Sequence, residues 1–315
     1  CFMGCTALET VGDLSSLKEI PYEAFDGCTS LVSIGDLNNV ESIANEAFSN
    51  CSALEHVDKL DKITSIGQNA FKGCTALKSI GSLHNLETIG QGAFSGCSAL
   101  EHVDDLYSLT RLEYDVFSHC VSLISVDCSD KLTAIGSSAF FGCKALVSIG
   151  DLSNVTSIES SVFRGCIALK SIGNMPKLES IGMQCFMGCT ALETVGDLSS
   201  LKEIPSETFD GCTSLVSIGD LSNVTIIGSY GFNQCKKLTS IPNLGSLERV
   251  DQFAFSGCES LALLGNLRKL TSFGYSPFVN SPFHNCPNLV LEVLPDSAAE
   301  QYAKDYNMQY TYITE

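Results

Sequence analysis

Cysteine returns along this chain at a fixed interval of 23 residues, and no other feature limits the possible folds so strongly. The cysteines of this series stand at residues 5, 28, 51, 74, 97, 120, 143, 166, 189, 212, 235 and 258. Phenylalanine keeps the same period, from Phe2, Phe25 and Phe48 through to Phe255. Self-similarity at a fixed period of this length is the signature of a repeat architecture, in which each unit is one structural module.

Each unit also carries a series of apolar residues, most of them three positions apart. In one unit these residues are Cys28, Leu31, Ile34, Leu37, Val40, Ile43, Ala47 and Phe48. An interval of three is neither the alternation of a strand nor a sustained helical pattern, and Gly, Asp, Asn and Ser interrupt it. A unit this short cannot bury its own apolar side chains. We therefore expect coils of short parallel strands and tight turns, stacked at about 4.8 Å.

The array shows signs of growth by duplication. Residues 1–20 recur letter for letter at 185–204, a shift of eight units. A catalytic centre needs one unique set of residues, which fits poorly with such duplication. The chain also lacks Gly-x-Ser-x-Gly, a Gly-Lys-Ser/Thr phosphate loop and His-Glu-x-x-His. We therefore expect no enzyme activity and no cofactor.

The repeat resembles that of the BspA-like, Treponema pallidum-type leucine-rich-repeat family. The residues that carry the resemblance are Leu31-x-x-Ile34, Val40-x-x-Ile43 and Ala47-Phe48-x-x-Cys51. The Ala-Phe-x-x-Cys element is specific to this type of repeat, and the resemblance covers essentially the whole chain. It implies an α/β-type repeat solenoid of mostly short parallel β-strands and turns, a curved right-handed leucine-rich-repeat array of about 12–13 coils.

The same resemblance bears on function. Members of this family are thought to be secreted or surface-exposed adhesins and interaction proteins of host-associated bacteria and some parasitic protists. The resemblance therefore implies an extracellular or cell-surface location. It also implies binding of a protein or glycan on a host or neighbouring cell surface, with no catalytic residues.

The repeat departs from the family pattern at one point. The family usually has an apolar residue followed by proline where this chain has Asp36-Leu37. The same pair recurs as Asp13-Leu14, Asp105-Leu106, Asp151-Leu152, Asp197-Leu198 and Asp220-Leu221. We expect the backbone to shift register here so that leucine takes the core position.

Stacked units would place the carboxylates of Asp13 and Asp36, and those of Asp197 and Asp220, about 5 Å apart, where they repel each other. Each pair therefore needs a compensating partner. The simplest is a set of hydrogen bonds from backbone amides at the turns, as in the asparagine ladder of other leucine-rich repeats. A calcium ion held by oxygen ligands of adjacent coils is the alternative.

The cysteine column allows three interpretations: disulfides, metal ligands or buried free thiols. Side chains of adjacent coils would be parallel and point inward, and the chain has no Cys-x-x-Cys pair for zinc. Buried cysteine behaves as a small hydrophobic residue, so we expect free thiols in the core and no metal. Cys1 and Cys185 replace the usual alanine and are expected in the core as well. Such a ladder suits a reducing or anaerobic setting.

Serine, threonine and histidine occupy a column that we expect to face solvent on the strands. Its candidate ligand-binding residues are Ser33, His56, Ser79, His102, Ser125 and Ser148, with Glu55 and Glu101 in the column beside it. A flat row of small hydrogen-bonding groups suits a protein or a glycan. The alternative is that serine and threonine merely tolerate a crowded sheet face, with the histidines as ordinary surface residues.

The charge balance limits the partners. The chain has 36 acidic and 18 basic residues, a net charge of −18. Nucleic acid and anionic lipid both need a basic surface, so we expect neither. No apolar run is long enough to cross a bilayer, so we expect no direct membrane insertion. The resulting hypothesis is a monomeric interaction module that binds a macromolecular ligand on the concave face of its strands. The alternative is a structural spacer or stalk that presents another domain and has no ligand of its own.

The C-terminal part of the chain breaks the repeat. Residues 1–286 form the array of 23-residue units, which begins inside a repeat, and residues 287–315 are expected to form a cap. Ser297-x-x-Glu300 is a capping box that opens a short helix, and Tyr310 and Tyr312 alternate in a final strand. Before the cap, the segment 276–280 is repeated with one change at 281–285 and predicts a bulge in the coil.

Overall fold

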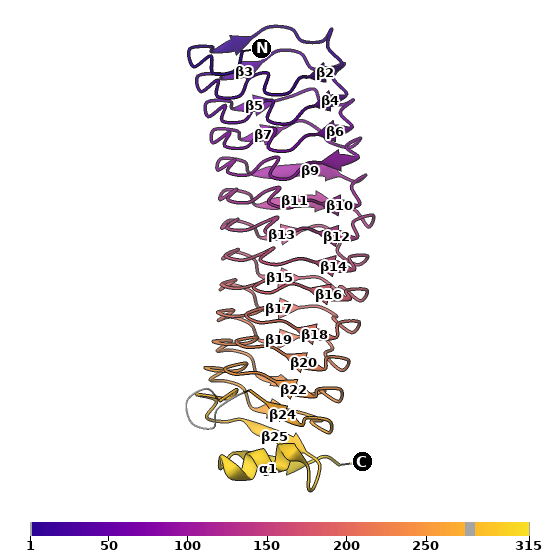
Figure 1. Ribbon diagram of the computed structural model, residues 1–315, viewed down its shortest axis with the longest axis vertical. Coiled ribbons are helices and arrows are strands. Elements are labelled where there is room, and N and C mark those ends of the chain that lie inside the picture. Colours follow the sequence, from indigo (N-terminus) through magenta and orange to yellow (C-terminus); the bar gives the residue numbers. More distant parts are fainter. Residues whose placement is uncertain (1, 275–280, 315) are drawn as a thin grey trace. The chain divides into compact units, whose positions relative to one another are not determined.

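The computed structural model describes residues 2–274 and 281–314. The chain divides into two compact units, Cys1–Val155 and Thr156–Glu315. Each unit by itself is a parallel β-solenoid, a stack of coils that follow nearly the same path (Figure 1). The expected bulge falls partly on residues 275–280, which lie outside the described residues.

In the first unit, successive coils contribute strands to two parallel rows. The first strand row consists of β1 (Thr10–Val11), β3 (Ser33–Ile34), β5 (His56–Val57), β7 (Ser79–Ile80), β9 (His102–Leu106), β11 (Ser125–Cys128) and β13 (Ser148–Ile149). The second strand row consists of β2 (Glu19–Ile20), β4 (Ser42–Ile43), β6 (Ser65–Ile66), β8 (Thr88–Ile89), β10 (Arg111–Leu112) and β12 (Ala134–Ile135).

The second unit has the same two rows. Its first strand row consists of β15 (Ser171–Ile172), β17 (Thr194–Val195), β19 (Ser217–Ile218), β21 (Ser240–Ile241), β23 (Leu263–Leu264), β25 (Val290–Val293) and β26 (Gln309–Tyr312). Its second strand row consists of β14 (Ser157–Ile158), β16 (Ser180–Ile181), β18 (Glu203–Ile204), β20 (Ile226–Ile227), β22 (Arg249–Val250) and β24 (Ser272–Phe273). One helix, α1 (Ala298–Asp305), lies between β25 and β26 in the chain.

In most strand pairs, each residue lies opposite the residue 23 positions further along the chain. In the first row, His56 lies opposite Ser33 on one side and Ser79 on the other. In the second row, Ile20 lies opposite Ile43. Residues one period apart therefore occupy equivalent positions in successive coils, as the sequence predicts. The repeat pattern does not reveal that the second row is a separate sheet, because an apolar column such as that of Ile43 indicates only that these side chains are buried.

Columns of phenylalanine and cysteine fill the interior of each unit. Phe48 and Cys51 are fully buried, and the ring of Phe48 stacks on that of Phe25 with centroids 5.2 Å apart. The thiol of Cys51 donates a hydrogen bond to the Phe25 carbonyl at 3.1 Å. The same bond recurs coil after coil, for example from Cys74 to the next carbonyl at 3.1 Å. The thiol column therefore supplies hydrogen bonds as well as apolar volume, which an alanine column could not.

The Asp-Leu pair sits in the coil as expected. Leu37 is fully buried, whereas Asp36 is only half-buried and lies toward solvent. Two coils lack this leucine. One has the fully buried Met175 in its place, and the other has Cys128, which pairs with Leu106 after a register shift. Cys128 is buried, so an apolar side chain takes the core position there too. The prediction that leucine takes the core position is confirmed, while a shift of the backbone relative to the family pattern stays a prediction.

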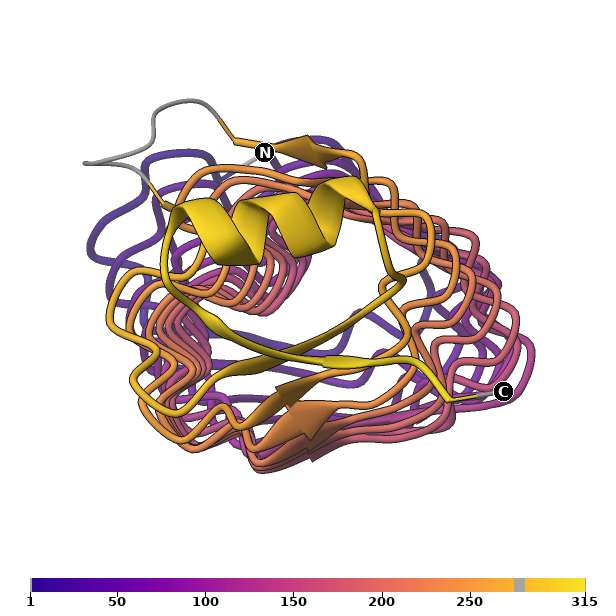
Figure 2. The same cartoon turned by 90° about the horizontal axis from the view of Figure 1, so that it is seen from below.

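The C-terminal cap closes the last coil of the second unit. Helix α1 lies across the end of the coils, with β26 beside it (Figure 2). Ser297 is the N-cap and accepts a hydrogen bond from the Glu300 amide at 3.2 Å, as the capping box predicts. The Glu300 carboxylate in turn accepts a hydrogen bond from the Asp296 amide. In a standard capping box the donor is the amide of the N-cap residue, which is Ser297 here. Ala299 and Ala303 are the buried apolar face of the helix.

Candidate functional site

The predicted recognition residues lie on the first strand row of the first unit. Ser33, His56, Ser79, His102, Ser125 and Ser148 belong to β3, β5, β7, β9, β11 and β13 respectively. All of them are exposed except Ser125, which is half-buried. Glu55 and Glu101 lie just before β5 and β9, the first half-buried and the second exposed. The period brings these side chains together along one face.

Hydrogen bonds connect neighbouring side chains on this face. His56 Nδ1 lies 2.8 Å from Ser79 Oγ, one coil further along. His102 Nδ1 lies 3.0 Å from Ser125 Oγ in the same way. The Lys78 ammonium donates to Glu55 at 2.9 Å, and this hydrogen bond and charge lower the pKa of the Glu55 carboxyl. These contacts order the polar groups of the face, and each histidine bonds a serine of the next coil.

Aliphatic side chains interrupt the polar face. Val32, Ile124 and Val147 occupy the same column as Glu55, and 39–44% of each residue is exposed. An interaction surface commonly combines exposed apolar groups with polar groups that fix orientation. The surface of the first strand row is therefore chemically more varied than its serine column alone predicts.

The second strand row forms another outward surface, which the repeat pattern does not reveal. Ser42, Ser65 and Thr88 line a shallow depression of about 590 Å³, bordered by Glu19 and Tyr22. Gly67 is also part of its lining. A Cβ at Gly67 would come within 2.5 Å of the Asn45 amide nitrogen, so the tight stacking of the coils requires glycine here.

Most aspartates of the Asp-Leu pairs cap their own turns, whereas Asp105 lies in β9 and accepts from Ser82 Oγ at 2.7 Å. Asp13 accepts from the Ser15 amide at 2.7 Å, and Asp36 accepts from the Asn38 amide at 2.9 Å. Asp197 and Asp220 each accept from the amide two residues on, both at 2.8 Å. The expected backbone hydrogen bonds are thus present, but they are local turns and do not run from coil to coil as an asparagine ladder does.

The asparagine ladder itself stands three positions further along. Asn39 donates to the Ser15 carbonyl of the preceding coil at 2.9 Å, and Asn85 donates to the Asp61 carbonyl at 2.7 Å. In the second unit, Asn223 makes the equivalent bond at 2.8 Å. The Asn residues of this column are interspersed with Lys and Ser, which hides the ladder in the sequence.

The repulsion between neighbouring aspartates is relieved in different ways. The Lys59 ammonium lies 3.1 Å from the Asp36 carboxylate and has the equivalent position in the next coil. Hydrogen bonds from Ser15 lower the pKa of Asp13. Among residues 2–274 and 281–314, no group of three or more His, Cys, Asp or Glu side chains is arranged to hold a metal ion. Calcium binding by the column remains an untested prediction.

The cysteine ladder consists of free thiols. Fourteen of the fifteen described cysteines are buried or half-buried, and Cys5 is exposed. Cys185 is fully buried, which confirms its predicted place in the core, while Cys1 lies outside the described residues. Burial raises the pKa of Cys51 and of Cys143 to about 12. Such thiols are protonated at neutral pH and are poor nucleophiles and metal ligands.

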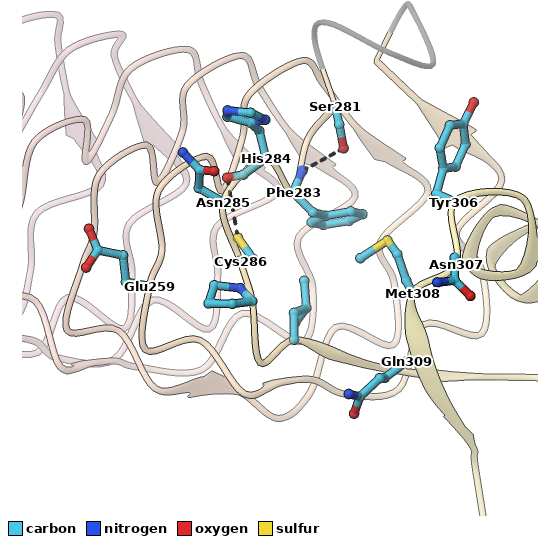
Figure 3. Close-up of a pocket in the computed structure, with 12 residues that line it drawn as sticks. Glu259, Ser281, Phe283, His284, Asn285, Cys286, Tyr306, Asn307, Met308 and Gln309 are labelled. Carbon is cyan, nitrogen blue, oxygen red and sulfur yellow. Dashed lines mark hydrogen bonds between the residues drawn. The ribbon is translucent and has the colours of Figure 1, made fainter.

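A cavity of about 710 Å³ lies between the last coil and the cap of the second unit (Figure 3). Cys286 and His284 both line it. The thiol donates to the Phe255 carbonyl at 3.0 Å, and its only contact with His284 is to the carbonyl, at 3.9 Å. In Figure 3 the imidazole points away from the sulfur. The pair therefore lacks the thiol–imidazole contact of a cysteine nucleophile.

The fold and its surfaces define a class of protein: a parallel β-solenoid of leucine-rich repeats. A family model described as BspA type leucine rich repeat region (6 copies) matches residues 1–124, 64–193 and 179–293. The chain belongs to this BspA-type leucine-rich-repeat family. Proteins with this repeat are typically non-enzymatic binding or structural modules.

Two solved structures illustrate the similarity. A leucine-rich repeat protein from Bacteroides ovatus is 28% identical over 99% of this chain and 85% of its own, with a TM-score of 0.71. A leucine rich cell surface protein from Faecalibacterium prausnitzii is 25% identical over 84% of this chain and 85% of its own, with a TM-score of 0.50. No curated protein matches the sequence. Within the described part of the chain, no helix has the length and apolar character needed to cross a membrane.

Proposed function

We propose that this chain is a cell-surface or secreted interaction module that binds a macromolecule on the first strand row of its first unit. The observation that carries this proposal is the pair of solvent-facing columns on that row. One column has hydroxyl and imidazole groups, such as Ser33, His56 and Ser148, and the other has exposed aliphatic groups such as Val147. A surface location is supported by the F. prausnitzii relative, which is described as a cell surface protein.

The chemistry of this face suits a protein or glycan partner on a host or neighbouring cell. Hydroxyl and imidazole groups can exchange hydrogen bonds with either, while Val32 and Ile124 offer apolar contact. The net charge of −18 disfavours nucleic acid and anionic membranes. The specificity of such a face comes from many weak contacts over several coils and needs no deep cavity.

The test replaces one residue at a time on the two faces. Ser148→Arg adds a bulky cation to the first strand row, and Ser65→Arg adds the same group to the second row as a matched control. The full chain and both variants are applied to a panel of host extracellular-matrix proteins and to a glycan array. We expect Ser148→Arg to weaken the strongest hit by at least about tenfold, and Ser65→Arg to leave it unchanged.

Two outcomes would contradict the proposal. If no component of the panel binds the wild-type chain, the spacer alternative gains support, which the repeated block at residues 1–20 and 185–204 also favours. If a component binds but Ser148→Arg binds as well as the wild type, recognition lies elsewhere on the molecule.

A further inference from the structure

In most coils of the array, the turn before the first strand row is covered by the next coil. In the second unit, the amides of Phe255 and Gly257 each donate to a carbonyl of the following coil at 2.8 Å. The Phe255 carbonyl accepts the thiol of Cys286 from that same coil at 3.0 Å. Stacking of a coil thus supplies two acceptors and one donor to the turn beneath it.

The last turn, Phe283–Cys286, lacks this cover because the cap replaces only part of a coil. Strand β26 continues the first strand row by pairing with β25 over four residues. The cap does not continue the turn: the Phe283 amide bonds instead to Ser281 Oγ at 3.2 Å. Among the described residues, the Asn285 amide and the Phe283 carbonyl have no hydrogen-bond partner. These are the equivalents of the Gly257 amide and the Phe255 carbonyl.

The 710 Å³ cavity occupies the place of this missing turn (Figure 3). Its floor is apolar: Phe283 and Leu289 are buried, and the half-buried thioether of Met308 lies beside the Phe283 ring. Its rim is polar and exposed, with the amide side chains of Asn285 and Gln309. The volume lies within the range of about 300–1,000 Å³ that is typical of ligand pockets.

The charges at the cavity favour a basic ligand. Among the described residues that line the cavity, Glu259 is the one carboxylate and none is a lysine or arginine. Lys236 lies 3.2 Å from Glu259, but both side chains are largely exposed, so water screens this pair. The chain as a whole carries a net charge of −18, which adds to the attraction for a cation.

We propose that this pocket binds a peptide segment of a partner protein in the place of the missing turn. An aromatic or long aliphatic side chain of the peptide packs on Phe283, Leu289 and Met308. A backbone carbonyl of the peptide accepts from the Asn285 amide, and a side-chain donor such as a cysteine thiol meets the Phe283 carbonyl. A neighbouring basic residue faces Glu259. The site is distinct from the first strand row and goes beyond the function proposed for it.

The chain's own turns provide the probe, because the pocket has the position of such a turn. A fluorescein-labelled peptide with the sequence of residues 69–77 contains a phenylalanine followed by a lysine. Binding to the full-length chain is measured by fluorescence anisotropy. Two altered peptides serve as controls, one with alanine for the phenylalanine and one with glutamate for the lysine. We expect each to bind at least about tenfold more weakly than the parent peptide.

Protein variants then locate the binding site. Met308→Lys places a charge on the apolar floor and should weaken the parent peptide at least about tenfold, whereas Met308→Leu should keep binding within about threefold. Glu259→Lys changes only an exposed side chain and should reverse the preference between the lysine and glutamate peptides. Ser148→Arg, on the first strand row, should leave peptide binding unchanged.

The proposal is overturned if the wild-type chain does not bind the parent peptide, or if Met308→Lys binds it as tightly as the wild type. It is equally overturned if the glutamate peptide binds as well as the lysine peptide. Because the peptide substitutions leave the protein intact, this last comparison holds even if a variant fails to fold. A ligand of the first strand row is lost in Ser148→Arg and not in Met308→Lys, so the two proposals fail independently.

Discussion

At the scale of single residues, the tight turns hold the backbone in the left-handed region at two positions. One position is the residue before each ladder cysteine, which is glycine in most units, as at Gly188 with φ +73°. At this position Gln234 has φ +59° and His119 has φ +61°. The other position is mostly occupied by residues other than glycine, such as Glu46 with φ +57°. A side chain disfavours this conformation, so these positions store backbone strain.

A pair of substitutions tests the strain directly. Gln234→Gly should raise the free energy of unfolding by about 1 kcal/mol, because glycine adopts this φ without penalty. Gly188→Ala should lower it by about 1 kcal/mol, although a Cβ there would meet nothing within 4 Å. The measurement is urea unfolding followed by circular dichroism. Equal stability of Gly188→Ala and the wild type would show that the turn relaxes and stores no strain.

At the scale of secondary-structure elements, the cap helix depends on one carboxylate. Glu300 is buried and accepts hydrogen bonds from the Asp296 amide at 2.8 Å and from Tyr312 OH at 2.6 Å. Lys304 lies 2.8 Å away, one helical turn along. The hydrogen bond from Lys304, followed by those from Tyr312 and Asp296, lowers the pKa of Glu300 to about 2. One side chain thus joins the start of α1 to its own last turn and to β26.

This carboxylate makes the stability of the cap sensitive to acid. The pKa of Glu300 is lower in the folded chain than the value of about 4.3 expected in the unfolded chain. Its contribution is therefore fully present above about pH 4.3 and is lost as the pH falls toward 2. Thermal melts of the wild type and Glu300→Gln should differ most near pH 6 and converge as the pH falls to about 2. A difference in melting temperature that stays constant over this range would contradict the assignment.

At the scale of the whole molecule, the thiol columns of both units respond to alkali. Burial raises the pKa of Cys51, Cys143 and Cys189 to about 12, and it also raises the pKa of Cys97 and Cys212 well above the usual value. An unfolded cysteine ionises near pH 8.5. Protonated thiols therefore favour the folded state below about pH 8.5, and this contribution is lost as the pH rises toward 12.

The expected result is a steep loss of stability in alkali. Above about pH 8.5, each buried thiol should lower the free energy of unfolding by about 1.4 kcal/mol per pH unit. Urea unfolding between pH 7 and 10.5, under a reducing agent, measures the slope. Cys143→Ala should be less stable at pH 7 but should lose stability less steeply with pH. If the slopes of the two proteins are the same, the thiols are not the titrating groups.

Much of this architecture can be predicted from the repeat alone. The burial of Phe48, Cys51 and Leu37 follows from their period, because residues at one period can only stack on their own equivalents. The exposure of Ser33 and His56 was predicted for the same reason and is confirmed. The helix at Ser297–Glu300 follows from local capping chemistry. The role of the exposed columns in recognition stays a prediction.

Other features depend on contacts that the repeat pattern does not encode. The second strand row is a separate surface because the coil bends between Ile34 and Ile43, a bend that the apolar spacing alone does not specify. The pairing of Asp36 with Lys59 depends on which side chains happen to follow one another in a variable column. The pocket at Phe283 exists because the cap supplies a strand without a turn.

The sequence by itself thus determined the stacked coils, the buried columns and the outward face, since periodic burial leaves few ways to fold a unit of 23 residues. Only the tertiary structure decided which polar groups are left without partners. That outcome depends on how the cap ends the stack, where the repeat no longer imposes its period. The physical reason is that the burial of a residue depends on its position within the unit. Whether a polar group finds a hydrogen-bond partner depends instead on which segment packs against that unit.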